Sequence, residues 1–156
     1  MLKPLLKQEQ HVLELQQVLK LLMVRKSMVA TNLVALAIDA SKNAYVPYSH
    51  FPIGAALKTK EGHVFTGCNI ENASFGLTNC GERTAIFKAV SEGYKDLTEI
   101  AIYGETQEPV SPCGACRQVM AEFFPASAKV TLIAKDGRTQ ETSVGDLLPY
   151  SFTDLN

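Results

Sequence analysis

The sequence predicts an α/β fold: a three-layer αβα sandwich built on one mixed five-stranded sheet. Two observations predict it. Segments with helical periodicity alternate with short apolar or alternating runs, and their order along the chain is helix, hairpin, helix, strand, helix, strand, strand. At 156 residues the chain is long enough to bury a single core of ordinary domain size.

Three segments carry apolar residues at helical spacing, at 31–43, 81–91 and 114–124. In the first of them the residues that share one helical face are Leu33, Leu36, Ala37 and Ala40. A residue that disfavours helix follows each segment: Pro47, Gly93 and Pro125.

Five short runs are expected to be strands, at 53–58, 63–70, 98–103 and 129–134, with a final short strand after a turn at Asp136 and Gly137. Lys60-Glu61-Gly62 separates the first two runs and is typical of a hairpin. Helices that connect the later strands are expected to cover both faces of the sheet.

Residues 1–28 differ in pattern from residues 29–156, which are expected to form a domain of their own. Apolar residues recur in the first segment at three- and four-residue spacing: Val12, Leu15, Leu19 and Leu22. This predicts an amphipathic N-terminal helical extension. It could contact a partner or a membrane surface, or it could be an extension that packs on its own oligomer or a translated leader.

The amino-acid composition of the chain limits the kinds of partner that it can bind. The chain has 15 Lys and Arg against 16 Asp and Glu, and a formal net charge of -1. Proteins that hold nucleic acid through its phosphates normally need a basic surface, so a small substrate is expected and nucleic acid is not. No apolar run approaches the roughly 20 residues of a membrane span. We therefore expect a cytoplasmic protein, in which four cysteines favour metal binding or burial over disulfides.

Three of the cysteines stand at predicted helix starts. Cys80-Gly81-Glu82 begins one helix, and Pro112-Cys113-Gly114-Ala115-Cys116 begins another. Two strand-to-helix turns in one sheet can bring these helix starts together. Thiolates suit zinc, and three protein ligands leave one tetrahedral position open for water. The pattern therefore predicts a catalytic zinc site formed by Cys80, Cys113 and Cys116.

The charge of such a site needs compensation, because three thiolates outweigh a divalent cation by one charge. Two helix N-termini contribute partial positive charge and free N–H groups, and Arg83 is placed to hydrogen-bond the sulfurs. Glu82 lies two residues after a ligand and is the candidate general acid and base.

The residues from about 29 to 156 resemble the small homotetrameric cytidine deaminases. The resemblance rests on four blocks in order: YSHFPIGAA at 48–56, GCNIENASFG at 67–76, NCGERTA at 79–85 and SPCGACRQ at 111–118. A zinc set of cysteines with a non-ligand Glu nearby is a known pattern of zinc deaminases. The family more often has Ala where this chain has Gly81.

The resemblance implies roles for residues around the zinc. Asn69 and Glu71 would hydrogen-bond the ribose hydroxyls, and Phe51 would pack against the pyrimidine. The Gly81 N–H would contact the base carbonyl, and the Ser111 carbonyl would receive the exocyclic amine. An amide and a carboxylate left unpaired would penalise binding of a bare base.

The resemblance also implies an assembly and a reaction. Phe75 and Phe152 match aromatic positions that reach into a neighbouring subunit's site, so a homotetramer with one zinc per subunit is expected. The implied reaction is hydrolytic deamination of cytidine and 2'-deoxycytidine to uridine and 2'-deoxyuridine, as in pyrimidine salvage.

Several alternatives stay open from the residues alone. Cys68 could complete a structural zinc site, Glu82 could be an ordinary acid of a first helical turn, and Asn69 with Glu71 could be a solvated strand end. The substrate could be a modified nucleoside such as blasticidin, or cytosine in RNA. The chain could also be a catalytically silent, zinc-stabilised assembly module.

Overall fold

The computed structural model describes residues 12–17 and 32–153. Residues 12–17 are helical and exposed, in agreement with the helical periodicity at Val12 and Leu15. The rest of the predicted N-terminal extension, with Leu19 and Leu22, lies outside the described residues. Asn32 and the residues after it form a separate compact unit.

One five-stranded mixed sheet forms the centre of that unit, in the order β2-β1-β3-β4-β5. Its strands are β1 (Ile53–Thr59), β2 (Val64–Cys68), β3 (Leu97–Gly104), β4 (Lys129–Ile133) and β5 (Thr139–Ser143). β1 pairs antiparallel with β2 and with β3, β3 runs parallel to β4, and β4 pairs antiparallel with β5. The predicted mixed α/β sheet is confirmed.

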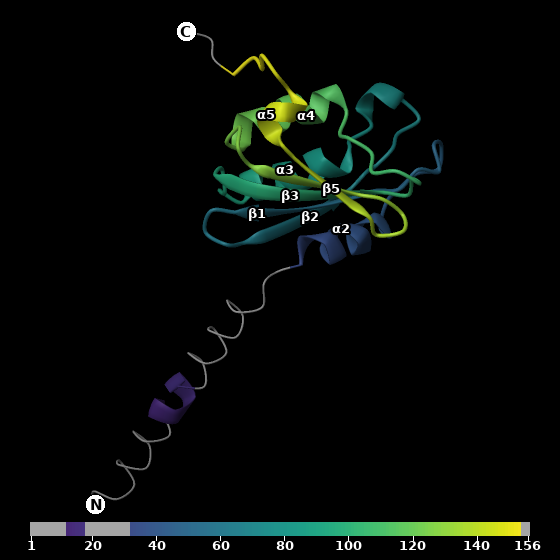
Figure 1. The fold of residues 1–156 in the computed structure, drawn as a ribbon. Helices are drawn as coiled ribbons and strands as arrows, with labels where there is room; N and C mark the ends of the chain where they lie inside the picture. The colour runs from purple at the N-terminus through teal and green to yellow at the C-terminus, as the bar shows by residue number, and fades with distance from the viewer. Residues whose placement is uncertain (1–11, 18–31, 154–156) are drawn as a thin grey trace, which may run out of the picture. The chain divides into compact units, whose positions relative to one another are not determined.

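Helices cover both faces of the sheet (Figure 1). α2 (Leu33–Ser41) packs on one face, against β1, β2 and β3. The opposite face carries α3 (Gly81–Ser91), α4 (Gly114–Phe123) and the short α5 (Val144–Leu147). The parallel pair β3 and β4 is connected through α4, which is the crossover that such a pair requires.

Alternation along the strands divides the core into two layers. Ala55 and Leu57 of β1 belong to the larger cluster, under α3 and α4, whereas Ala56 between them belongs to the smaller cluster, under α2. All three are fully buried. Successive strand residues point to opposite faces, so one short apolar run serves both layers.

The predicted segments and the observed elements differ mainly at their ends. The helix expected at 31–43 spans Leu33–Ser41, and the strand expected at 63–70 spans Val64–Cys68. Two short elements have no counterpart in the prediction: the 3-10 turn η1 (Phe75–Leu77) and α5. Each covers only three or four residues, too few to show a periodicity.

Close backbone approach at Gly67 sets the position of α3. A Cβ at Gly67 in β2 would lie 2.4 Å from the backbone nitrogen of Ala85 in α3 and 2.5 Å from the carbonyl oxygen of Gly81. Only glycine permits α3 to lie so near the sheet. The start of α3, which follows Cys80, is thereby fixed against β2.

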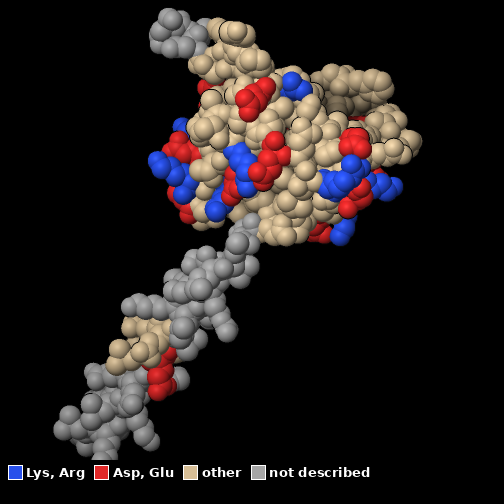
Figure 2. Space-filling view, viewed as in Figure 1, with Lys and Arg blue, Asp and Glu red and all other residues tan. Residues whose placement is uncertain are grey.

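Charged side chains are mixed on the face drawn in Figure 2, where Lys and Arg lie among Asp and Glu. One example is Glu99, which lies within 3.8 Å of both Lys58 and Lys129. Among residues 12–17 and 32–153, no helix is long and apolar enough to cross a membrane.

Candidate active site

Three cysteines meet where α3 and α4 begin. Cys80 precedes α3, Cys113 precedes α4, and Cys116 lies in the first turn of α4. The Sγ atoms of Cys80 and Cys113 are 3.9 Å apart, those of Cys113 and Cys116 are 3.5 Å apart, and all three lie within 4.8 Å of one another. The structure therefore brings together the predicted metal ligands.

This spacing fits a single zinc ion. Tetrahedral zinc with Zn–S bonds of about 2.3 Å requires sulfurs about 3.8 Å apart, close to the separations found here. Cys68 is not part of the cluster, which among the described residues contains Cys80, Cys113 and Cys116 alone. The four-cysteine structural site is therefore not supported, and the three thiols form an incomplete tetrahedral set.

Hydrogen bonds among the thiols already favour negative charge in the cluster. A hydrogen bond from Cys116, and a further one from Arg83, lower the pKa of Cys80 to about 5. The same bond to Cys80 raises the pKa of Cys116. A metal ion bound at the centre would take the place of the shared protons.

Arg83 lies beside the cluster, as the sequence predicted. Its Nη2 is 3.4 Å from the Sγ of Cys80 and 3.4 Å from the carbonyl oxygen of Thr78. The cluster lies at the N-termini of α3 and α4, where the helix dipole contributes partial positive charge, and neither Cys80 nor Cys113 caps its helix with its side chain.

Glu82 is buried beside the thiols, with only 4% of its surface exposed. Its Oε2 has no hydrogen-bond partner although it is inaccessible to solvent. Burial, with a smaller contribution from Cys80, raises the pKa of Glu82 to about 7. A carboxyl group with these properties is not an ordinary surface acid of a first helical turn. Its burial and its pKa suit proton transfer near neutral pH.

A pocket of about 300 Å³ opens in front of Cys80, Cys113 and Glu82. Its size is at the lower end for small-molecule sites. The predicted site residues that line it are Phe51, Asn69, Glu71, Cys80, Glu82, Ser111 and Cys113. These residues come from four different sequence blocks, and the fold gathers them at one place.

Asn69 and Glu71 also hold the chain that enters β1. The Asn69 side chain accepts a hydrogen bond from the Ile53 N–H at 2.9 Å and donates one to the Phe51 carbonyl at 2.8 Å. The Glu71 carboxylate accepts from the Tyr48 and Ser49 N–H groups, at 3.0 and 3.2 Å. Hydrogen bonds from Ser49 in particular lower the pKa of Glu71, which therefore stays ionised.

Phe75 and Phe152 lie outside this pocket. Phe75 is 73% exposed, and its ring packs edge to face against Tyr48 with centroids 5.7 Å apart. It lines a neighbouring pocket that shares Ser49, Glu71 and Thr78 with the first. Phe152 is 65% exposed, and its backbone carbonyl accepts a hydrogen bond from Gln118.

Gly81 is buried at the start of α3, between Cys80 and Glu82. A Cβ at this position would lie 3.2 to 3.3 Å from atoms of Ile53 and Cys68.

Sequence reasoning missed several pocket residues: Ser49, Ile53, Thr78, Ile102, Val110 and Pro112. Ser49, Ile53 and Pro112 lie inside the recognised sequence blocks, which were the available signal for them. Ile102 and Val110 carried no signal, because an apolar side chain at a pocket wall has the same pattern as one in the core.

Fold and site together define a class: an α/β protein with three clustered cysteines that could hold a metal ion, a buried acid beside them and a pocket for a small molecule. The family model described as the cytidine and deoxycytidylate deaminase zinc-binding region matches residues 28–132. The chain belongs to this family and is an enzyme of the hydrolase class that acts on C–N bonds.

Individual relatives agree with this assignment. A cytidine deaminase from Halalkalibacterium halodurans is 58% identical over 126 residues, which cover 80% of this chain and 96% of that protein. One from Sporosarcina psychrophila is 51% identical, over 78% of this chain and 89% of that protein. The crystal structure of a cytidine deaminase from Burkholderia pseudomallei matches with a TM-score of 0.76 and 50% identity, over 80% of this chain and all of that one.

Proposed function

We propose that the chain catalyses hydrolytic deamination of cytidine and 2'-deoxycytidine to uridine and 2'-deoxyuridine. One observation carries this proposal: the buried Glu82 carboxyl group, with an unpartnered oxygen, lines the same small pocket as two of three clustered thiols. A silent assembly module would have no use for an acid whose burial is so costly. The family of the chain and its relatives support the same reaction.

Cys80, Cys113 and Cys116 would hold one zinc ion per chain. Bound zinc supplies a Lewis acid that makes water a nucleophile near neutral pH. Glu82 takes one proton from the attacking water and delivers it to N3 of the cytosine ring as the water oxygen bonds to C4. It then carries the second proton of that oxygen to the amine. The C4–N bond breaks, so ammonia leaves and the uracil ring of uridine or 2'-deoxyuridine remains.

The remaining residues hold the substrate. The Phe51 ring packs against the pyrimidine, the Gly81 N–H donates to the base carbonyl, and the Ser111 carbonyl accepts from the exocyclic amine. Asn69 and Glu71 receive the ribose hydroxyls. The contacts of Asn69 and Glu71 with the backbone support this role, because they fix both side chains before a substrate arrives.

A free nucleoside suits the pocket better than a polymer. The pocket of about 300 Å³ has room for a single small molecule. The net charge of -1 and the mixed charges of the surface offer little attraction to a phosphate backbone. We therefore place the enzyme in salvage of pyrimidine nucleosides, in the cytosol, where thiols stay reduced.

Assembly as a homotetramer would complete each site from a neighbouring subunit. Phe75 and Leu77 are 73% and 72% exposed, Phe75 lines the pocket that adjoins the substrate pocket, and Phe152 is also exposed. Large apolar side chains that are exposed close together mark surfaces of association. A second subunit would cover them, and Phe75 or Phe152 would then close the neighbour's substrate pocket.

An ultraviolet assay tests the proposed reaction. Zinc-loaded protein is mixed with cytidine, 2'-deoxycytidine, blasticidin or a cytosine-containing oligonucleotide, and the loss of cytosine absorbance is followed. We expect both nucleosides to be converted and the oligonucleotide to be left intact. Zinc-loaded protein that leaves both nucleosides unchanged would contradict the proposal, and preferential conversion of blasticidin or the oligonucleotide would change the substrate.

A further inference from the structure

Arg117 makes three hydrogen bonds beside the pocket, each through a different nitrogen. It follows Cys116 in α4 and is half-buried. Its Nε donates to the Pro112 carbonyl at 2.7 Å, its Nη2 to the Ser111 Oγ at 2.7 Å and its Nη1 to the Leu147 carbonyl at 3.0 Å. The planar guanidinium thus joins the segment before Cys113 to the end of α5.

Ser111 and Pro112 have few other hydrogen bonds. They lie in the irregular stretch 109–113 between β3 and α4, where Pro112 is buried and has a ring-fixed φ, whereas Ser111 is exposed. Among residues 32–153, no other hydrogen bond to the Ser111 side chain or to the Pro112 carbonyl is found. The peptide that carries the Ser111 carbonyl is bounded by these two Arg117 contacts, so its direction depends on Arg117.

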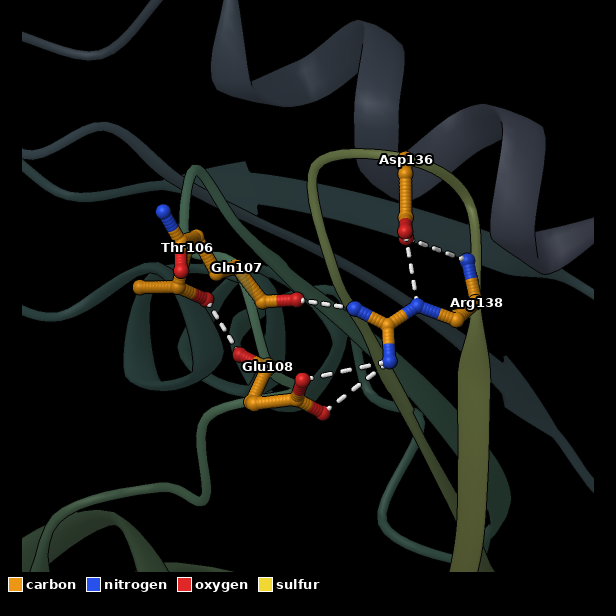
Figure 3. A network of polar contacts seen from close by, with 5 residues as sticks. All are labelled: Thr106, Gln107, Glu108, Asp136 and Arg138. Atoms are coloured by element: carbon orange, nitrogen blue, oxygen red, sulfur yellow. Dashed lines mark hydrogen bonds and ion pairs between the residues drawn. The ribbon is translucent and has the colours of Figure 1, made fainter.

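A second arginine, Arg138, contacts residues 107 and 108, near the start of the loop that connects β3 to α4 (Figure 3). Arg138 donates to the Gln107 carbonyl at 2.6 Å and to both oxygens of the Glu108 carboxylate at 3.2 Å, and Asp136 accepts from its Nε at 2.6 Å. Arg138 does not line the pocket, and its side chain is 55% exposed. The loop therefore has one guanidinium anchor at the pocket and one remote from it.

We propose that Arg117 is a positioning residue that aims the Ser111 carbonyl at the exocyclic amine of the substrate. The inference rests on the proposed function, in which that carbonyl recognises the amine. Without the guanidinium, the Ser111 side of the Ser111–Pro112 peptide loses its hydrogen-bonded anchor, and the amine meets an acceptor that is less firmly fixed in advance. The thiol cluster is held by the helix starts instead, so zinc binding does not depend on Arg117.

The test compares Arg117→Ala with Arg138→Ala. For each variant we would measure zinc per chain, kcat/KM for cytidine and the inhibition constant of uridine, which has no amine to donate. Arg117→Ala is expected to lower kcat/KM for cytidine at least about tenfold, which corresponds to the loss of one well-placed hydrogen bond. Zinc per chain and the inhibition constant of uridine are expected to change less than about twofold. Arg138→Ala, which removes an exposed anchor, is expected to stay within about twofold of the wild type.

Arg117→Lys keeps the charge and the aliphatic stem, in case the alanine variant does not fold. The single ammonium group of lysine cannot donate in the three directions of the guanidinium group, so we expect the same selective loss of kcat/KM for cytidine. A folded, zinc-loaded Arg117 variant with unchanged kcat/KM for cytidine would overturn the inference. An equal weakening of uridine inhibition and of kcat/KM for cytidine would also overturn it, because such a result indicates a general structural role. A wild-type protein that leaves cytidine unchanged would instead refute the proposed function.

Discussion

The carboxyl group of Glu82 combines two properties that exposed acids do not have. It is buried, and one of its oxygens has no partner. Burial raises its pKa to about 7, so both protonation states are accessible at neutral pH, as a group that takes and returns a proton requires. The sequence predicted this residue from its place two positions after a cysteine, but its burial and its orphaned oxygen depend on the packing of α3.

Glu82→Gln is expected to abolish deamination while it leaves the zinc site intact. Glutamine has nearly the same shape but cannot shuttle a proton, so kcat should fall by about a thousandfold or more. Zinc per chain should match the wild type, because the three thiols are unchanged. Glu92→Gln, in an exposed position after α3, is the matched control. Near-normal turnover of Glu82→Gln would remove the proposed proton carrier.

Arg83→Gln is expected to weaken zinc retention, and more at low pH than at high pH. Hydrogen bonds from Cys116 and then from Arg83 lower the pKa of Cys80 to about 5. Without Arg83 part of this lowering is lost, and protons then compete with zinc for the sulfur at pH values where the wild-type thiol is ionised. Competition with a chelator at pH 6 and pH 8 measures the difference. Equal zinc retention by the two proteins at both values would contradict this account of charge balance.

At the level of elements, the starts of α3 and α4 form the site, and the sequence predicted both helix starts. Helical periodicity and the cysteine spacing were sufficient for that. The contacts of Asn69 with Phe51 and Ile53 could not be predicted, because they join positions 18 and 16 residues apart. The anchors of the loop before Cys113 were also missed, because Arg117 reaches α5, an element too short to predict.

Gly67→Ala is expected to displace the start of α3 from the sheet. The added methyl group would meet backbone atoms of Gly81 and Ala85, and overpacking of this kind costs about 3 kcal/mol in the free energy of unfolding. Because α3 begins directly after Cys80, zinc content and activity per folded chain should fall as well. Denaturant unfolding and metal analysis on the same sample measure both effects.

Gly54→Ala is the matched control on the other face of the sheet. Its Cβ would meet the backbone of α2, at Ala37 and Ser41, where no site residue lies. We expect a comparable loss of stability but normal zinc content and activity in the folded fraction. If Gly67→Ala kept its zinc and activity while Gly54→Ala lost them, the proposed link between α3 packing and the site would be wrong.

At the scale of the whole molecule, the alternation of helices and strands along the chain explains the α/β fold class. Helix and strand segments alternate, and the parallel pair β3 and β4 needs the crossover that α4 supplies. Apolar side chains exposed at Phe75 and Leu77 are the part that the fold of one chain does not explain. The place of Phe75 beside the pocket is the reason to expect that a second chain completes the site.

Mixing two defective variants tests this shared site. Phe75→Ala keeps its own Glu82 but gives its neighbour no ring, whereas Glu82→Gln gives an intact Phe75 but has no proton carrier. Hybrids formed by dissociation and reassembly should contain sites with both groups intact, so activity should exceed the sum of the separate variants. Activity that stays at that sum, with hybrids demonstrated by mass spectrometry, would mean that each chain completes its own pocket.

The proposed reaction requires that three sulfurs hold zinc and leave one position open beside Glu82. X-ray absorption spectroscopy of the zinc-loaded protein tests this coordination most directly. We predict three sulfur ligands at about 2.3 Å and one oxygen or nitrogen ligand at about 2.0 Å. A spectrum with four sulfur ligands would contradict the proposed site, because the position at which water must be activated would then be closed by a fourth cysteine.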